Sequence, residues 1–125
     1  MEMENEFEYD FEEGELEALR ELFNYPECEN GTWALNPKSV EAFGAAAKII
    51  TKEMKGQNVT VEVNPFSESS KLGTIAIKSK ELIVFRNPKV VAELGRYGVG
   101  IDFTAYLDGT TEVLFSFKTA TKIND

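Results

Sequence analysis

Histidine is absent from the 125-residue chain, and cysteine occurs only once, at Cys28. Because histidine is the commonest general base and the commonest metal ligand, its absence argues against both catalysis and metal binding. One cysteine cannot form an internal disulfide, and the neighbouring Glu27 and Glu29 disfavour its nucleophilic thiolate form. We therefore expect no catalytic residue, no metal and no cofactor.

Basic clusters and long apolar runs are also missing. The amino-terminal residues alternate glutamate with apolar residues, whereas a signal peptide has a basic leader and an apolar core, and a membrane span has a long apolar run. Nucleic-acid binding needs clustered Lys and Arg, which the chain does not contain. We expect a cytoplasmic protein that binds neither membrane nor nucleic acid.

The chain has a formal net charge of −9, and this charge is unevenly distributed. Residues 1–30 contain twelve carboxylates and a single base, Arg20, which gives −11. Residues 31–125 contain ten acids and twelve bases, which gives +2. The acidity of the protein is therefore a property of its first thirty residues.

An acidic side chain occupies every even position from Glu2 to Glu12, and three of the odd positions are aromatic. A strand would place the acids on one face and the aromatic residues on the other, although repulsion among like charges favours an extended, unpaired chain. We call residues 1–12 the acidic arm. The side chains that we expect to contact a partner are Glu2, Glu4, Glu6, Phe7, Glu8, Tyr9, Asp10, Phe11 and Glu12.

The remaining residues, 13–125, are predicted to form a single α+β domain, because their length and their 42% hydrophobic content suit one core. We expect an antiparallel sheet of about five strands with two to three helices packed on one face, in the order ααβββαββ. The helices are predicted at residues 13–24, 37–55 and 88–96, and the strands at residues 58–63, 74–79, 82–86, 99–106 and 110–121.

The second and third helices have the clearest signals, because each begins with an Asn cap followed by Pro, and each ends at a glycine. The segment N-P-K-x-V occurs at both Asn36 and Asn87. A duplicated β-α-β-β unit would explain this echo, and convergence on a common helix opening is the alternative.

The closing hairpin has a register that follows from its alternation. Ile101 and Phe103 share one apolar face of its first strand, and Val113 and Phe115 share one face of its second. A three-residue loop at 107–109 brings these faces together and places Gly109 in the left-handed conformation of a bulged turn. Ile101 is then predicted to lie opposite Phe115, and Phe103 opposite Val113. The same register predicts that Val99 lies opposite Phe117.

Large apolar residues at helical or strand spacing are expected to build the core. These candidates are Val40, Phe43, Ala47, Ile50, Ile83, Val84, Phe85, Val91, Leu94, Ile101, Phe103, Phe115 and Phe117.

Only weak signals for chemistry remain. Asp102 lies in the middle of a predicted strand, on the face shared with Tyr106, and a solvent-facing position explains it most simply. The glycine-rich segment at 95–100 ends a helix and begins a strand, which is the reverse of a phosphate-binding loop. If a pocket exists between sheet and helices, its polar lining is predicted to be Arg96, Tyr97, Asp102 and Tyr106.

Three functions fit this sequence. The first is a non-enzymatic protein-interaction module, such as a small inhibitor or adaptor, that engages a basic partner through the acidic arm. The second is a small-molecule-binding or carboxylate-dependent enzymatic domain. The third is a structural subunit whose sheet edge pairs in a homodimer.

Overall fold

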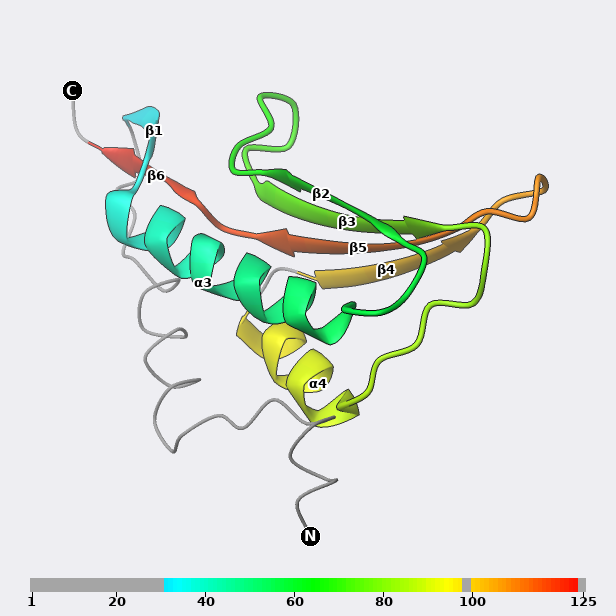
Figure 1. The fold of residues 1–125 in the computed structure, drawn as a ribbon. Helices are drawn as coiled ribbons and strands as arrows, with labels where there is room; N and C mark the ends of the chain where they lie inside the picture. Colours follow the sequence, from blue (N-terminus) through cyan, green and yellow to red (C-terminus); the bar gives the residue numbers. More distant parts are fainter. Residues whose placement is uncertain (1–30, 98–99, 124–125) are drawn as a thin grey trace, which may run out of the picture.

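The computed structural model describes residues 31–97 and 100–123 (Figure 1). The acidic arm and the helix predicted at residues 13–24 lie outside the described residues. The described elements follow one another as β1 (Thr32–Leu35), α3 (Pro37–Glu53), β2 (Thr60–Asn64), β3 (Gly73–Ser79), α4 (Pro88–Tyr97), β4 (Gly100–Ala105), β5 (Thr111–Phe117) and β6 (Ala120–Ile123).

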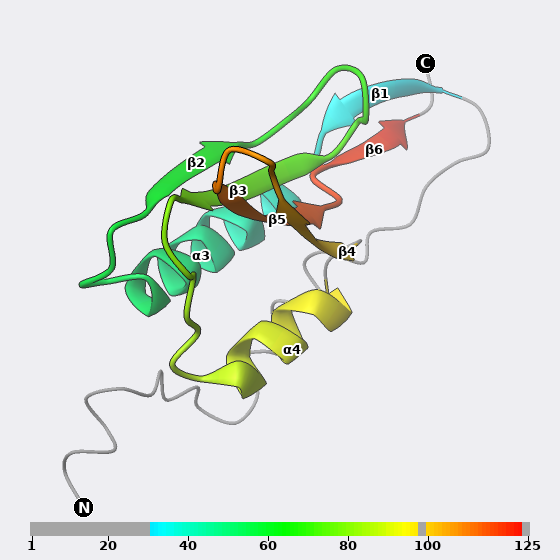
Figure 2. The same ribbon diagram turned by 90° about the vertical axis from the view of Figure 1, so that its right-hand side faces the viewer.

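The strands form two antiparallel sheets. The larger sheet has the strand order β2-β3-β5-β4, and the smaller one pairs β1 with β6. Both helices lie on the same face of the larger sheet, as the two views in Figures 1 and 2 show. The predicted α+β class is thus confirmed, whereas the single five-stranded sheet and the order ααβββαββ are wrong in detail.

Helix α3 forms where the sequence predicted it. The side chain of Asn36 caps its first turn by accepting hydrogen bonds from the backbone N–H groups of Lys38, at 3.0 Å, and Ser39, at 3.3 Å. Gly56 follows the helix with a φ of +88°, a left-handed conformation that glycine adopts without strain. Residues spaced three and four apart form the buried face of α3: Ser39, Ala42, Phe43, Ala46, Ile49, Ile50 and Glu53.

Helix α4 begins in the same way. The Asn87 side chain accepts a hydrogen bond from the backbone N–H of Lys89 at 3.2 Å. Each helix is followed by an antiparallel hairpin, β2-β3 after α3 and β4-β5 after α4, and β3 and β5 are the two central strands of the sheet. The two α-β-β units therefore occupy equivalent places, and the duplication of the segment stays a prediction.

The core lies between the larger sheet and its two helices. Its buried members include Phe43 and Ile50 from α3, Ile75 from β3, and Phe115 and Phe117 from β5. The ring of Phe43 meets that of Phe117 edge-on at 5.9 Å, and the rings of Phe115 and Phe117 stack at 6.4 Å. These aromatic contacts join the helix layer to the sheet layer.

The strand predicted at residues 82–86 is wrong, because this segment pairs with no strand of the described chain. Both neighbouring places beside β3 are taken, one by β2 and the other by β5. The side chain of Gln57 replaces a strand partner, since its Nε2 donates to the Val84 carbonyl at 2.6 Å and its Oε1 accepts from the Val84 N–H at 3.0 Å. Val84 is half exposed, which also contradicts its prediction as a core residue.

The strand predicted at residues 110–121 is divided into β5 and β6. At the break, the Thr119 carbonyl accepts a hydrogen bond from the Asn36 N–H at 2.9 Å, and the Thr119 hydroxyl donates to the Pro65 carbonyl. Thr119 is fully buried. These contacts direct the chain out of the larger sheet, so that β6 pairs with β1.

The predicted register of the last hairpin is confirmed. Ile101 lies opposite Phe115, and Phe103 lies opposite Val113. Tyr106 donates its N–H to the Thr110 carbonyl at 2.8 Å, which leaves a loop of residues 107–109, and Gly109 has a φ of +90°. The pairing predicted for Val99 lies outside the described residues.

A substitution at Gly73, the first residue of β3, tests how tightly this residue packs against Thr119 and Pro65. A Cβ atom there would lie 2.6 Å from Cγ2 of Thr119 and 2.9 Å from the carbonyl oxygen of Pro65. Gly73→Ala is expected to lower the free energy of unfolding, measured in urea, by about 1–3 kcal/mol through overpacking.

Gly44 in α3 supplies the matched control, because a Cβ there would meet nothing within 4 Å. Gly44→Ala is expected to raise the free energy of unfolding by about 0.5–1 kcal/mol, since alanine favours the helix. Equal effects of the two substitutions would contradict the close packing at Gly73.

Candidate functional site

The face of the larger sheet that points away from the helices carries a connected group of polar side chains. Residues of β3 and β5 alternate between the two faces, so Ile75, Ile77, Val113 and Phe115 point into the core while the residues between them point outward. We call this surface, formed by the outward residues of all four strands, the outer face. The pairing places Lys78 between Thr60 and Glu112.

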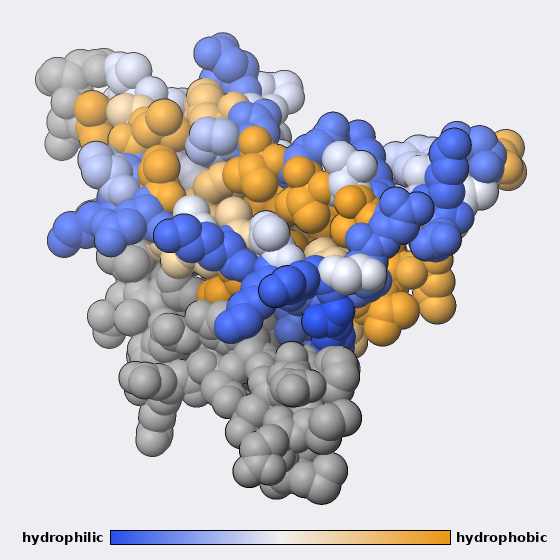
Figure 3. Space-filling model, in the orientation of Figure 1, coloured by the Kyte–Doolittle hydropathy of each residue, from blue (hydrophilic) through white to orange (hydrophobic). Residues whose placement is uncertain are grey.

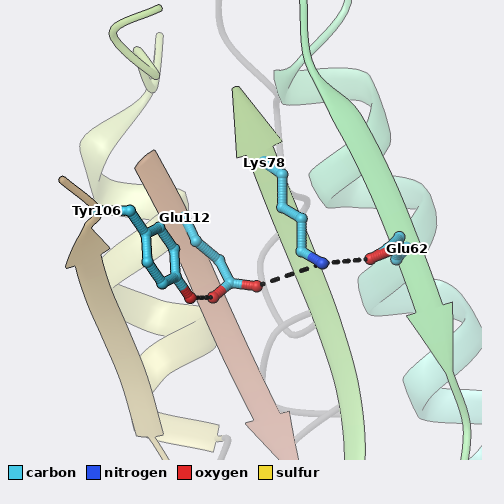
Figure 4. Close-up of polar contacts among 4 residues, drawn as sticks. All are labelled: Glu62, Lys78, Tyr106 and Glu112. Carbon is cyan, nitrogen blue, oxygen red and sulfur yellow. Dashed lines mark hydrogen bonds and ion pairs between the residues drawn. The ribbon is translucent and has the colours of Figure 1, made fainter. Parts of the chain in front are cut away.

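Lys78 joins two acidic side chains on this face. Its Nζ lies 2.9 Å from Oε2 of Glu62 on β2 and 3.9 Å from Oε2 of Glu112 on β5 (Figure 4). The hydrogen bond and the charge of Glu62 raise the pKa of Lys78 above its ordinary value. Because Lys78 and Glu62 are exposed, solvent screens their attraction and this pair contributes little to folding stability.

Tyr106, which directly follows β4, adds a fourth side chain to this group. Its hydroxyl donates a hydrogen bond of 2.8 Å to Oε1 of Glu112 (Figure 4). This hydrogen bond, together with a smaller contribution from desolvation, raises the pKa of Tyr106, because the phenolate cannot donate to the carboxylate. Glu62, Lys78, Glu112 and Tyr106 thus form one continuous row across the sheet, which we call the polar row.

Asp102 adds a further acid to the outer face, at the β4 edge of the sheet. It lies opposite Leu114 of β5 and is exposed. With Glu62 and Glu112 it makes three carboxylates against the one ammonium of Lys78. The outer face therefore carries a net negative charge, which is the same sign as that of the acidic arm.

Among the predicted site residues, the structure describes the side chains of Asp102 and Tyr106 only. Asp102 and Tyr106 share the outer face, as their alternation indicated, and they lie on the side of the sheet opposite to the helices. They therefore do not line a space between sheet and helices. The side chains of Arg96 and Tyr97, at the end of α4, and all residues of the acidic arm lie outside the described part of the chain.

Sequence reasoning did not identify Glu62, Lys78 or Glu112 as a group. Each of these residues occupies a polar position in an alternating strand, which indicates an outward side chain. Their proximity depends on the strand order β2-β3-β5, which brings together segments far apart in the chain. No local pattern encodes that order.

On the helix-covered face, a small hollow opens beside β4. It has a volume of about 250 Å³, and its apolar lining comes from Leu82, Ile83, Phe103, Ala105 and Val113. Phe103 is 70% exposed and Leu82 is 80% exposed, so the prediction of Phe103 as a core residue is wrong. Figure 3 shows hydrophobic side chains reaching the surface on the side of the molecule where β4 and residues 81–87 lie.

Two further properties concern only the described residues. Nowhere in residues 31–97 and 100–123 do three or more His, Cys, Asp or Glu side chains converge as a metal ion would require. Neither α3 nor α4 combines the length and the apolar character needed to cross a membrane.

Comparison with protein-family models finds no match for this chain, and comparisons with curated proteins and with solved structures find no similar protein.

The contact between Tyr106 and Glu112 predicts a measurable titration. Glu112→Ala removes the acceptor and its charge, so the pKa of Tyr106 is expected to fall toward its ordinary value. The phenolate absorbance would be followed against pH, and the curve of a Tyr106→Phe variant would be subtracted to isolate this tyrosine.

Glu62→Ala is the control, because it removes the other partner of Lys78 and leaves the Tyr106 hydrogen bond in place. Since the fold raises the pKa of Tyr106, its contribution to stability is complete below the unfolded-state pKa and is lost as pH rises through the folded-state value. An unchanged Tyr106 pKa in Glu112→Ala would contradict the observed hydrogen bond.

Proposed function

We propose that this protein is a non-enzymatic interaction module of the cytoplasm, a small inhibitor or adaptor that engages a basic protein surface through its acidic arm. The observation that carries the proposal is the division of charge, −11 in residues 1–30 against +2 in residues 31–125. A charge of one sign concentrated in one segment attracts a basic partner from a distance and orients it before contact.

The composition of the arm supports direct contact as well as attraction. Phe7, Tyr9 and Phe11 alternate with acids, and segments that act only as solubilising tails contain few aromatic residues. If the arm binds in an extended conformation, its acids meet one wall of a basic groove and its aromatic residues meet the other. Aromatic anchors contribute strongly to affinity at protein interfaces.

The folded domain supports the proposal through the charge of its outer face. Glu62, Glu112 and Asp102 are present there with only Lys78 to balance them. A basic surface held by the arm would therefore meet three carboxylates on this sheet. The acidic arm and the outer face therefore carry charge of the same sign.

The deciding experiment is co-purification from the native cell with intact and truncated baits. Basic proteins recovered with the intact chain are expected to be lost when residues 1–12 are deleted. A double variant, Glu41→Gln with Glu68→Gln, is the control, because it removes two exposed acids that lie outside the outer face and leaves the arm intact. Recovery of the same proteins by the truncated bait would refute the proposal.

Binding to an oligolysine peptide separates charge from aromatic contact. Deleting residues 1–12 is expected to slow association on the order of tenfold or more at low salt, and the difference is expected to shrink as salt rises. Replacing Phe7, Tyr9 and Phe11 by serine retains every acid. That variant is expected to associate with the peptide at the intact rate. It is expected to dissociate faster from a basic protein recovered by co-purification.

A further inference from the structure

Strand β4 is an outer strand of the larger sheet, and within the described chain one of its edges has no neighbouring strand (Figure 2). Tyr106 and Thr110 form a hydrogen-bonded pair at the turn, with an N–H to carbonyl distance of 2.8 Å. Hydrogen-bonded and non-hydrogen-bonded pairs alternate along an antiparallel ladder. Ile101, Phe103 and Ala105 therefore direct their backbone N–H and C=O groups away from β5.

This edge lacks the features that normally prevent strand pairing between molecules. Natural edge strands are protected by lysine, proline or bulges, whereas Gly100–Ala105 contains one charge, Asp102, and neither lysine nor proline. The opposite edge strand, β2, carries Glu62 and is followed directly by Pro65. Its most exposed large apolar residue is Val63 at 49%, compared with 70% for Phe103 on β4.

The apolar surface beside this edge is centred on Phe103. Helix α4 covers the beginning of β4, where Gly95 lies so close to Ile101 that an added Cβ would be 2.7 Å from Cδ1 of that side chain. Beyond this contact, Phe103 and Leu82 remain exposed and border the 250 Å³ hollow. The exposed apolar surface and the backbone groups that pair with no described strand are thus on the same strand.

We propose that β4 pairs antiparallel with β4 of a second copy of this chain, so that two four-stranded sheets join into one of eight strands. A second copy is the occupant because the strand is complementary to itself around Phe103. With Phe103 opposite the partner's Phe103, Ile101 lies opposite the partner's Ala105. Because these residues direct their backbone groups away from β5, they then form hydrogen-bonded pairs with the partner strand. Two aromatic rings meet at the centre of the interface.

The outer face selects this register over its neighbours. With Phe103 at the centre, Asp102 lies opposite the partner's Thr104, whose hydroxyl tolerates a carboxylate. Moving the centre to Asp102 would place it opposite the partner's Asp102, and like charges directly opposed are destabilising. Moving the centre to Thr104 would place Ile101 opposite the partner's Leu107, which lies in the hairpin loop beyond the strand.

This interface is independent of the proposed partner binding, and salt distinguishes the two. Each copy carries a net charge of −9, so two copies repel each other and salt is expected to strengthen their association. Binding of a basic partner by the acidic arm is expected to weaken under the same conditions. Failure of one proposal therefore leaves a different result from failure of the other.

The mass of the full chain in solution is the first test. Light scattering is expected to give twice the 14.0 kDa of one chain for the unmodified protein and 14.0 kDa for Phe103→Lys. Val63→Lys places the same change on the other edge strand and is expected to remain dimeric. A monomeric unmodified chain at every soluble concentration, or dissociation by Val63→Lys alone, would overturn the proposal.

Cross-linking tests the register in the folded protein and does not depend on a destabilising substitution. In a Cys28→Ser background, Asp102→Cys and Thr104→Cys chains are expected to form a disulfide when they are mixed. Thr104→Cys is not expected to do so alone, because only a directly opposed, non-hydrogen-bonded pair brings the cysteines close enough. Cross-linking of Thr104→Cys with itself, or none in the mixture, would refute this register.

Discussion

The pairing of β3 with β5 is the interaction on which the rest of the molecule depends. It joins the unit formed by α3, β2 and β3 to the unit formed by α4, β4 and β5, from Gly73 opposite Phe117 to Ser79 opposite Thr111. The pair Ile75 with Phe115 and the pair Ile77 with Val113 place four apolar side chains under the helices. A shift by one residue would turn these side chains toward solvent, so burial of the core holds the register.

The same register creates the surface features. It places Lys78 opposite Glu112, and the pairing of β2 with β3 brings Glu62 to the other side of the lysine. It also leaves β2 and β4 at the two edges of the sheet, with unlike protection. The polar row, the negative outer face and the apolar edge at Phe103 all follow from one choice of central strand pair.

Sequence reasoning succeeded where the determining signals lie within a few residues. The cap at Asn36 and the glycine at 56 delimit α3, and the alternation around residues 107–109 predicted which residues of β4 and β5 face each other. Asp102 and Tyr106 were correctly expected on one face, because alternation alone decides the side of a strand. Each of these features depends on local backbone geometry.

The incorrect predictions concern features that depend on contacts between residues far apart in the chain. Residues 82–86 have the composition of a strand, yet the places beside β3 are occupied and the side chain of Gln57 bonds to Val84 instead. Phe103 has the pattern of a core residue, yet no described helix covers its end of β4, and it remains exposed. The buried Thr119 divides one predicted strand into β5 and β6 through its contacts with Asn36 and Pro65.

The sequence by itself therefore determined the charge of each segment, the two described helices, the closing hairpin and the face on which each strand residue lies. The acidity of residues 1–30 is one such property, since charge is additive along a chain and needs no fold. Only the tertiary structure decided which strands are neighbours, which acids surround Lys78 and which apolar side chains stay uncovered. These depend on contacts between distant segments, whose geometry is set by packing the whole core at once.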